Sequence, residues 1–127
     1  MKILVVDDNR GLAHILKMML ANEGFQIGFA RDAKDGYLTY LLFTPDVVIT
    51  DIQVPGENGL KLMEMIRRHD PEVNSIYTYT NPAYLGSVLV EEKMKYHVSL
   101  LQKPFSKSEL AKLLRQYKFR YPWIEQG

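Results

Sequence analysis

The chain has 127 residues, of which 46% are hydrophobic and 24% charged, so it has the size and composition of one globular domain. Its net charge of +1 gives no sign of the dense positive field that non-specific nucleic-acid binding requires, and leaves only local basic patches open. The lack of cysteine excludes disulfides, zinc thiolate sites and cysteine nucleophiles. No apolar run approaches the roughly 18 residues of a membrane span, and Asp7 and Asp8 interrupt the N-terminal apolar run where a signal peptide would continue. We therefore expect a cytoplasmic protein.

The predicted elements alternate between strands and helices along the chain. Short apolar or β-branched runs predict strands over 2–6, 26–30, 46–50, 75–80 and 98–101. Apolar residues at helical spacing predict helices over 10–22, 33–42, 59–68, 82–94 and 107–117. The second strand has the weakest pattern because it contains Gly28. This order is typical of an α/β domain in which helices cover both faces of a parallel sheet.

Acidic residues stand where two predicted central strands end. Asp7 and Asp8 follow the first strand, and Asp51 follows the third. In an open α/β sheet the carboxyl ends of the strands form the ligand crevice, so we expect these carboxylates to gather there. A hard divalent cation, Mg²⁺ first, is the natural partner of such a cluster. The alternative is that the aspartates cap the helices that follow them, as aspartate often does.

A lysine completes the predicted cluster. Lys103 follows the last predicted strand and precedes Pro104, so it also lies at a carboxyl end of the sheet. A lysine amine there can neutralise nearby carboxylates or hold a phosphoryl oxygen. By itself, a lysine in a loop is usually only solvated.

Three segments together carry a family resemblance: "VVDDN" at 5–9, "VVITDIQVPGENG" at 47–59 and "LLQKPFS" at 100–106. This pattern resembles the receiver domain of two-component response regulators, the group that includes the chemotaxis receivers. The resemblance implies a flavodoxin-like, doubly wound (βα)5 fold with a five-stranded parallel sheet in the order 2-1-3-4-5. It assigns the receiver domain to 1–119 and leaves 120–127 as a C-terminal tail or the start of a linker.

The resemblance also implies a function. Asp51 would accept a phosphoryl group from a phosphohistidine on a sensor histidine kinase or phosphotransfer protein. Mg²⁺ would be held by the side chains of Asp8 and Asp51 and the backbone carbonyl of Gln53, with Asp7 acting mainly through a water. Lys103 would bind the phosphoryl group beside the loop shaped by Pro55, Gly56 and Gly59. Such a domain is a signalling module rather than an enzyme.

The implied partners are the kinase and an output domain or downstream protein. A phosphorylation-dependent dimer is compatible with the family, whereas membrane contact and direct nucleic-acid binding by this domain are not expected. The cognate kinase and the output stay open.

Two positions depart from the family pattern. A Thr or Ser usually ends the fourth strand and binds the phosphoryl group, but here the register is ambiguous among Tyr79, Thr80 and Asn81. We assign the role to Thr80 for its hydroxyl, although β-propensity alone also explains a threonine there. An aromatic residue often stands three positions before the lysine, and Leu100 holds that position here.

Other functions remain as alternatives. A pseudo-receiver would keep the fold and bind partners without phosphorylation, as the departures at Thr80 and Leu100 allow. A Mg²⁺-dependent phosphatase would need a second acid where Gln53 stands, and a flavin-binding module would need a phosphate loop after the first strand. The basic run at 67–69 is interpreted as the end of a helix that complements the helix dipole.

Overall fold

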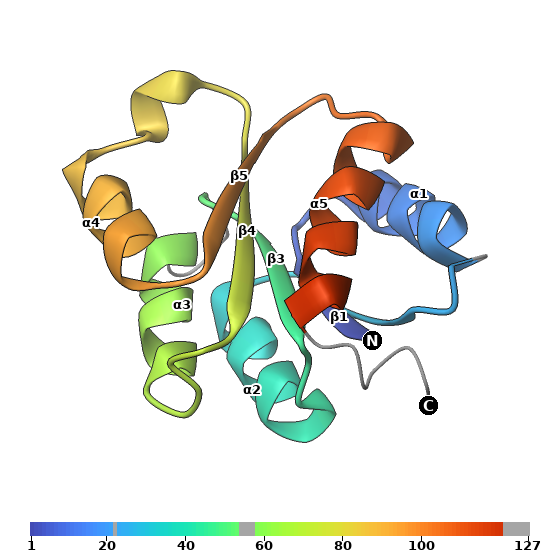
Figure 1. Ribbon diagram of the computed structural model, residues 1–127, viewed down its shortest axis with the longest axis horizontal. Coiled ribbons are helices and arrows are strands. Elements are labelled where there is room, and N and C mark those ends of the chain that lie inside the picture. Colours follow the sequence, from blue (N-terminus) through green and yellow to red (C-terminus); the bar gives the residue numbers. More distant parts are fainter. Residues whose placement is uncertain (22, 54–57, 121–127) are drawn as a thin grey trace.

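The computed structural model describes residues 1–21, 23–53 and 58–120. One parallel sheet runs through the domain in the order β2-β1-β3-β4-β5, as Figure 1 shows, and the predicted flavodoxin-like fold is confirmed. Its strands are β1 (Lys2–Val6), β2 (Gln26–Ala30), β3 (Val47–Asp51), β4 (Asn74–Tyr79) and β5 (Val98–Gln102). Strands β1 and β3 are almost fully buried, as expected for central strands covered on both faces.

Helices cover both faces of the sheet (Figure 1). They are α1 (Arg10–Ala21), α2 (Ala33–Phe43), α3 (Gly59–Arg67), α4 (Ser87–Lys95) and α5 (Lys107–Arg120), with a short 3-10 helix η1 (Pro82–Tyr84) before α4. Leu16 of α1 and Leu110 of α5 pack with Ile49 in one buried cluster. On the other face, Leu62 of α3 and Leu89 of α4 pack with Tyr77. The sheet therefore separates two hydrophobic cores.

The fourth helix differs from its prediction. The sequence predicted one helix over 82–94, but the chain forms η1, then continues through Leu85 and Gly86 in extended conformation before α4 starts. Asn81 caps η1, because its side-chain Oδ1 accepts a hydrogen bond from the Ala83 amide at 3.0 Å. The predicted helix is divided because Leu85 and Gly86 are extended and interrupt the helical hydrogen bonds.

The other predicted elements agree with the observed ones to within three residues at each boundary, and the first two strands match their predictions in full. Helix α5 continues to Arg120, one residue past the predicted domain end, and the predicted tail beyond it lies outside the described residues. Strand β2 forms over Gln26–Ala30 with Gly28 in it, and a side chain at that position would meet the Phe43 ring, with the added Cβ 3.2 Å from ring carbon Cδ2. None of the helices described in the structure is long and apolar enough to cross a membrane.

Candidate functional site

The candidate site lies at the carboxyl ends of three strands. Asp51 is the last residue of β3, and Asp7 directly follows β1, with its backbone amide bound to the Ala30 carbonyl at 3.0 Å. Lys103 directly follows β5, and its backbone amide donates to the carbonyl of Tyr79 at 2.7 Å. The parallel pairing of β1, β3 and β4, extended by β5, aligns these strand ends. Residues far apart in the sequence are thereby brought together.

The amine of Lys103 joins the two carboxylates. Its Nζ lies 2.6 Å from Oδ2 of Asp7 and 3.1 Å from Oδ2 of Asp51. The Asp7 side chain is only 2% exposed, and those of Asp51 and Lys103 are 20% and 18% exposed. The three groups therefore form one partly buried cluster whose positive charge sits between two negative ones.

Electrostatics keep this lysine charged. Burial disfavours the ammonium form, but hydrogen bonds from Lys103 to Asp7 and Asp51, together with their negative charges, outweigh burial and raise the pKa of Lys103. Lys103 is thus a cation under physiological conditions. The charged amine of Lys103 therefore lies next to the carboxylate on which a phosphoryl group would add negative charge.

Asparagines cap the two helices that follow the predicted site aspartates. The amide of Leu12 in α1 donates to Oδ1 of Asn9 at 3.1 Å. In α3, Oδ1 of Asn58 accepts from the amide of Lys61 at 2.8 Å. This observation opposes the capping interpretation and leaves Asp7 and Asp51 available for Lys103.

The loop after β3 is closed by contacts between its two ends. Gln53 and Asn58 form an isolated antiparallel bridge, and the Gly59 amide donates to the Ile52 carbonyl at 2.6 Å. A Cβ on Gly59 would lie 2.3 Å from the backbone oxygen of Asp51, so only glycine fits there. The backbone of Asp51 is therefore held tightly from the start of α3. Two loop residues that the sequence singled out, Pro55 and Gly56, lie outside the described residues.

The donors predicted for Mg²⁺ are only partly assembled. Asp8 is exposed, and so is Gln53, whose backbone amide donates to Oδ1 of Asp51 at 3.1 Å. Within the described parts of the chain, no three acidic or histidine side chains form a group that could hold a metal ion. The chemistry of the donors nevertheless fits a hard cation, because oxygens of Asp7 and Asp51 already converge on one positive charge.

The residues considered for the phosphoryl-binding hydroxyl occupy different environments. Thr80 follows β4 and is exposed, and its carbonyl accepts a hydrogen bond from Nε2 of Gln102 at 3.3 Å. Tyr79 is the last residue of the strand and is partly buried, and the side chain of Asn81 caps η1. Leu100 is partly buried and pairs with Tyr77 of β4.

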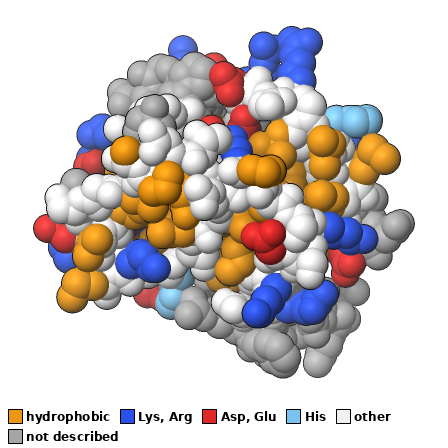
Figure 2. Space-filling model, turned by 90° about the horizontal axis from the view of Figure 1, so that it is seen from above, with side chains coloured by type: hydrophobic (Ala, Val, Ile, Leu, Met, Phe, Trp, Pro, Cys, Tyr) orange, Lys and Arg blue, Asp and Glu red, His pale blue; other side chains and the backbone are white. Residues whose placement is uncertain are grey.

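A cleft of about 360 Å³ opens beside Lys103. Its lining residues are mostly apolar and come largely from α1 and the β5–α5 loop; they include Leu12, Ile15, Met19, Thr80 and Phe105. Figure 2 shows this end of the molecule, where acidic and basic side chains lie next to one another with apolar side chains beside them. The cluster is thus reachable from solvent, next to an apolar surface.

Sequence reasoning missed a second buried polar cluster, between α3, α4 and β4. Arg67 was interpreted as a helix-end residue, but its Nη1 lies 2.7 Å from Oε1 of Glu92, and the side chain is only 4% exposed. Tyr77, buried in β4, donates its hydroxyl to the same Glu92 oxygen at 2.5 Å. These residues are 10 to 25 positions apart, and only the packing of α4 on the sheet brings them together.

Comparisons with known proteins agree with this geometry. The family of the response regulator receiver domain matches residues 3–115. The transcriptional regulatory protein TrcR of Mycobacterium tuberculosis is 28% identical over 127 residues, which are 98% of this chain and 48% of TrcR. The transcriptional regulatory protein PhoP of Escherichia coli K12 is 39% identical over 70 residues, 55% of this chain and 31% of PhoP. The chain thus spans less than half the length of these relatives.

Solved structures share the fold. A receiver domain protein of Clostridium thermocellum superposes with a TM-score of 0.83 at 23% identity, covering 97% of this chain and 98% of the other. A CheY-like receiver domain protein of Methanospirillum hungatei gives a TM-score of 0.84 at 21% identity, with 99% and 98% covered. Together with the family match over most of its length, the observations lead to one conclusion: this chain belongs to the response regulator receiver domains of two-component systems.

Proposed function

We propose that this receiver domain accepts a phosphoryl group on Asp51 and changes conformation to signal to a partner. The single observation that carries the proposal is the ion pair between Lys103 Nζ and Asp51 Oδ2 at 3.1 Å, at the solvent-reachable end of the sheet. A carboxylate acceptor and a fixed cation are the main protein groups that phosphoryl transfer requires.

In the proposed reaction a carboxylate oxygen of Asp51 attacks the phosphorus of the donor phosphohistidine. A P–O bond forms as the P–N bond breaks, and the leaving imidazole takes up a proton. Lys103 stabilises the negative charge on the phosphoryl oxygens, while the tight contact of Gly59 with the Asp51 backbone keeps the acceptor in place. The step needs little other chemistry from the protein.

We assign Mg²⁺ as the cofactor. The side chains of Asp8 and Asp51 and the backbone carbonyl of Gln53 would hold it, with Asp7 acting through a water. Mg²⁺ supplies positive charge to the phosphoryl oxygens in this chemistry. The carboxylate set supports the assignment, because hard oxygen donors suit this ion. We assign the phosphoryl-binding hydroxyl to Thr80, which lines the cleft next to Lys103.

The proposed partner is a histidine kinase or phosphotransfer protein. The apolar cleft beside Lys103 supports this, since a protein bound there would lie next to Asp51. Because the relatives are transcriptional regulators longer than this chain, an output domain or a downstream protein is the proposed receiver of the signal. We place the protein in the cytoplasm and regard it as a signalling module rather than an enzyme. A phosphorylation-independent pseudo-receiver is disfavoured, because the Asp7–Lys103–Asp51 cluster is intact.

Phosphorylation by a small donor tests the proposal. The protein is incubated with Mg²⁺ and acetyl phosphate, and intact-mass spectrometry follows the addition of one phosphoryl group. We expect labelling in the wild type that disappears without Mg²⁺ and in Asp51→Asn. Folded protein that shows no labelling, and no binding of the phosphoryl mimic beryllofluoride, would overturn the proposal.

A further inference from the structure

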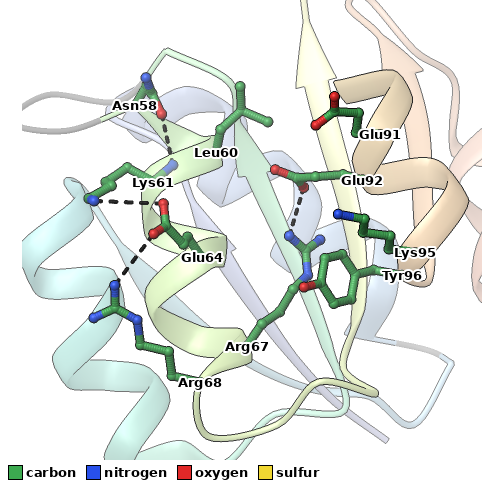
Figure 3. A pocket seen from close by; sticks show the side chains of 10 residues that line it. All are labelled: Asn58, Leu60, Lys61, Glu64, Arg67, Arg68, Glu91, Glu92, Lys95 and Tyr96. Carbon is green, nitrogen blue, oxygen red and sulfur yellow. Dashed lines mark hydrogen bonds and ion pairs between the residues drawn. The ribbon is translucent and has the colours of Figure 1, made fainter. Parts of the chain in front are cut away.

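A buried polar network ties α4 to the rest of the domain. Figure 3 shows Arg67 reaching from α3 toward Glu92 and Tyr96, which lie on α4 and just after it. Oε1 of Glu92 accepts hydrogen bonds from Nη1 of Arg67 at 2.7 Å and from the hydroxyl of Tyr77 at 2.5 Å. The Glu92 side chain is only 12% exposed. We call these two contacts the Glu92 latch.

Arg67 is held on several sides. Nη2 donates to Oγ of Ser75 at 3.0 Å, and the guanidinium carbon lies 4.4 Å from the ring centroid of Tyr96. Its Nε is buried and has no hydrogen-bond partner among the described residues. A buried donor left without a partner costs free energy.

Among the residues of α4 whose side chains the structure describes, few add apolar contacts to the latch. Leu89 is the one buried residue among those of α4 whose side chains the structure describes. Val90 and Met94 are 61% and 83% exposed, and Gly86 provides no side-chain cap at the start of the helix. The latch is therefore a large part of what fixes the position of α4 on the sheet.

The latch is connected to the phosphoacceptor through β4. Tyr77 directly precedes Thr78, whose Cα pairs with that of Asp51 on β3. Two residues beyond Tyr77, the carbonyl of Tyr79 accepts the backbone amide of Lys103. Burial raises the pKa of Tyr77, so its hydroxyl stays a hydrogen-bond donor to Glu92. One strand thus carries both the latch tyrosine and the backbone bound by the site lysine.

We infer that the Glu92 latch holds α4 in the unphosphorylated position and opposes phosphorylation of Asp51. The inference rests on the proposed phosphoacceptor function and names its regulation. A phosphoryl group on Asp51 competes for Lys103, which now bonds to Asp7 and Asp51 through its amine and to β4 through its backbone. Moving Lys103 displaces the end of β4 and strains the bond from Tyr77 to Glu92. Release of α4 is then the signal that a partner reads.

This mechanism predicts an effect on ligand affinity that a purely structural clamp would not have. If the latch favours the inactive state, removing it raises the population of the active state, which binds a phosphoryl mimic more tightly. The test variant is Tyr77→Phe, which removes only the hydroxyl. The matched control is Tyr117→Phe, which removes a buried hydroxyl that donates to Oγ of Ser99 at 2.8 Å on the opposite face of the sheet.

Beryllofluoride binding in the presence of Mg²⁺ is measured by titration calorimetry for the wild type and both variants, after thermal unfolding confirms that each is folded. We expect Tyr77→Phe to bind about five-fold more tightly than the wild type, since one hydrogen bond typically contributes about a factor of five to an equilibrium. Tyr117→Phe should stay within two-fold of the wild type. Glu92→Gln provides a second variant, whose affinity for beryllofluoride should also be higher than that of the wild type.

Hydrogen exchange of the α4 amides gives an independent readout. Without the mimic, α4 should exchange at least about five-fold faster in Tyr77→Phe than in Tyr117→Phe, and with the mimic bound the two should be alike. Equal mimic affinities in Tyr77→Phe, Glu92→Gln and the wild type would overturn the latch while leaving the phosphoacceptor function standing. Failure of the wild type itself to bind the mimic would overturn the function, and the latch inference with it.

Discussion

The amine of Lys103 lies 3.1 Å from a carboxylate oxygen of Asp51, although 52 residues separate the two in the sequence. The same amine lies 2.6 Å from the almost fully buried Asp7. This arrangement places a permanent positive charge against the proposed phosphoacceptor before any donor arrives. The Lys103 amine is thus already oriented to stabilise the negative charge of the transition state, which reduces the reorganisation that the reaction requires.

Replacement of Lys103 should affect both chemistry and stability. In Lys103→Met we expect phosphorylation of Asp51 by acetyl phosphate to slow by about 100-fold, since a fixed charge-stabilising group is lost. Because the buried Asp7 also loses its cation, the free energy of unfolding should fall by about 3 kcal/mol. Timed mass spectrometry and urea denaturation measure the two effects. Lys61→Met, which removes a surface lysine 3.6 Å from Glu64, is the control and should change neither.

The hydroxyl of Thr80 is expected to contribute to phosphoryl binding. In Thr80→Ala, affinity for beryllofluoride should fall by about five-fold, the usual effect of one lost hydrogen bond. Thr78→Val is the matched variant, because the hydroxyl of Thr78 is buried without a hydrogen-bond partner among the described residues. Calorimetric titration compares the two. If Thr78→Val lowered the affinity for beryllofluoride and Thr80→Ala did not, the phosphoryl-binding hydroxyl would be that of Thr78, the residue paired with Asp51.

Gly59 should tolerate no side chain. An alanine Cβ would stand 2.3 Å from the carbonyl oxygen of Asp51, so the backbone of one or the other must shift. We expect Gly59→Ala to lower the free energy of unfolding by about 2 to 3 kcal/mol and to slow labelling of Asp51. Gly86→Ala is the comparison, because a Cβ there meets nothing within 4 Å. Its cost should not exceed about 1 kcal/mol in the same denaturation experiment.

Arg67 and Arg68 are neighbours whose replacement should affect stability to very different extents. In Arg67→Met the buried carboxylate of Glu92 loses its cation, and the free energy of unfolding should fall by about 3 to 5 kcal/mol. Arg68 pairs with Glu64 at the surface at 3.4 Å, so Arg68→Met should change stability by no more than about 0.5 kcal/mol. Similar losses in the two variants would contradict the burial argument.

Stability should decline at alkaline pH. Burial raises the pKa of Tyr77, the charge of Arg67 opposes this, and Glu92 adds to the rise. The pKa of Lys103 is also raised, because its two carboxylates outweigh burial. Above the unfolded-state values of about 10, the unfolded chain therefore loses protons that the folded protein keeps.

The free energy of unfolding should accordingly be steady below about pH 9.5 and fall above pH 10, by up to about 1.4 kcal/mol per pH unit for each group. Urea denaturation at pH 8 and pH 11 measures this slope. Tyr77→Phe should show a smaller decline than the wild type over that interval, and an equal decline would contradict the assignment to Tyr77.

The sequence by itself determined the order of strands and helices and the residues at the strand ends. Continuous apolar runs such as that of β3 fix a buried strand by local chemistry, so the sequence alone places Asp51 and Lys103 at strand ends. The motifs near the two ends and in the middle of the chain were likewise sufficient to predict the family, because each is a short run of residues with its own spacing.

Only the tertiary structure decided which side chains meet. The sharing of Lys103 by two carboxylates depends on how strand ends align, and the burial of Arg67 against Glu92 depends on where α4 packs. A basic run at a helix end predicts only a favourable dipole contact, so it gave no sign of a partner 25 residues away. Local periodicity encodes the elements, whereas long-range pairing follows from packing that no short segment contains.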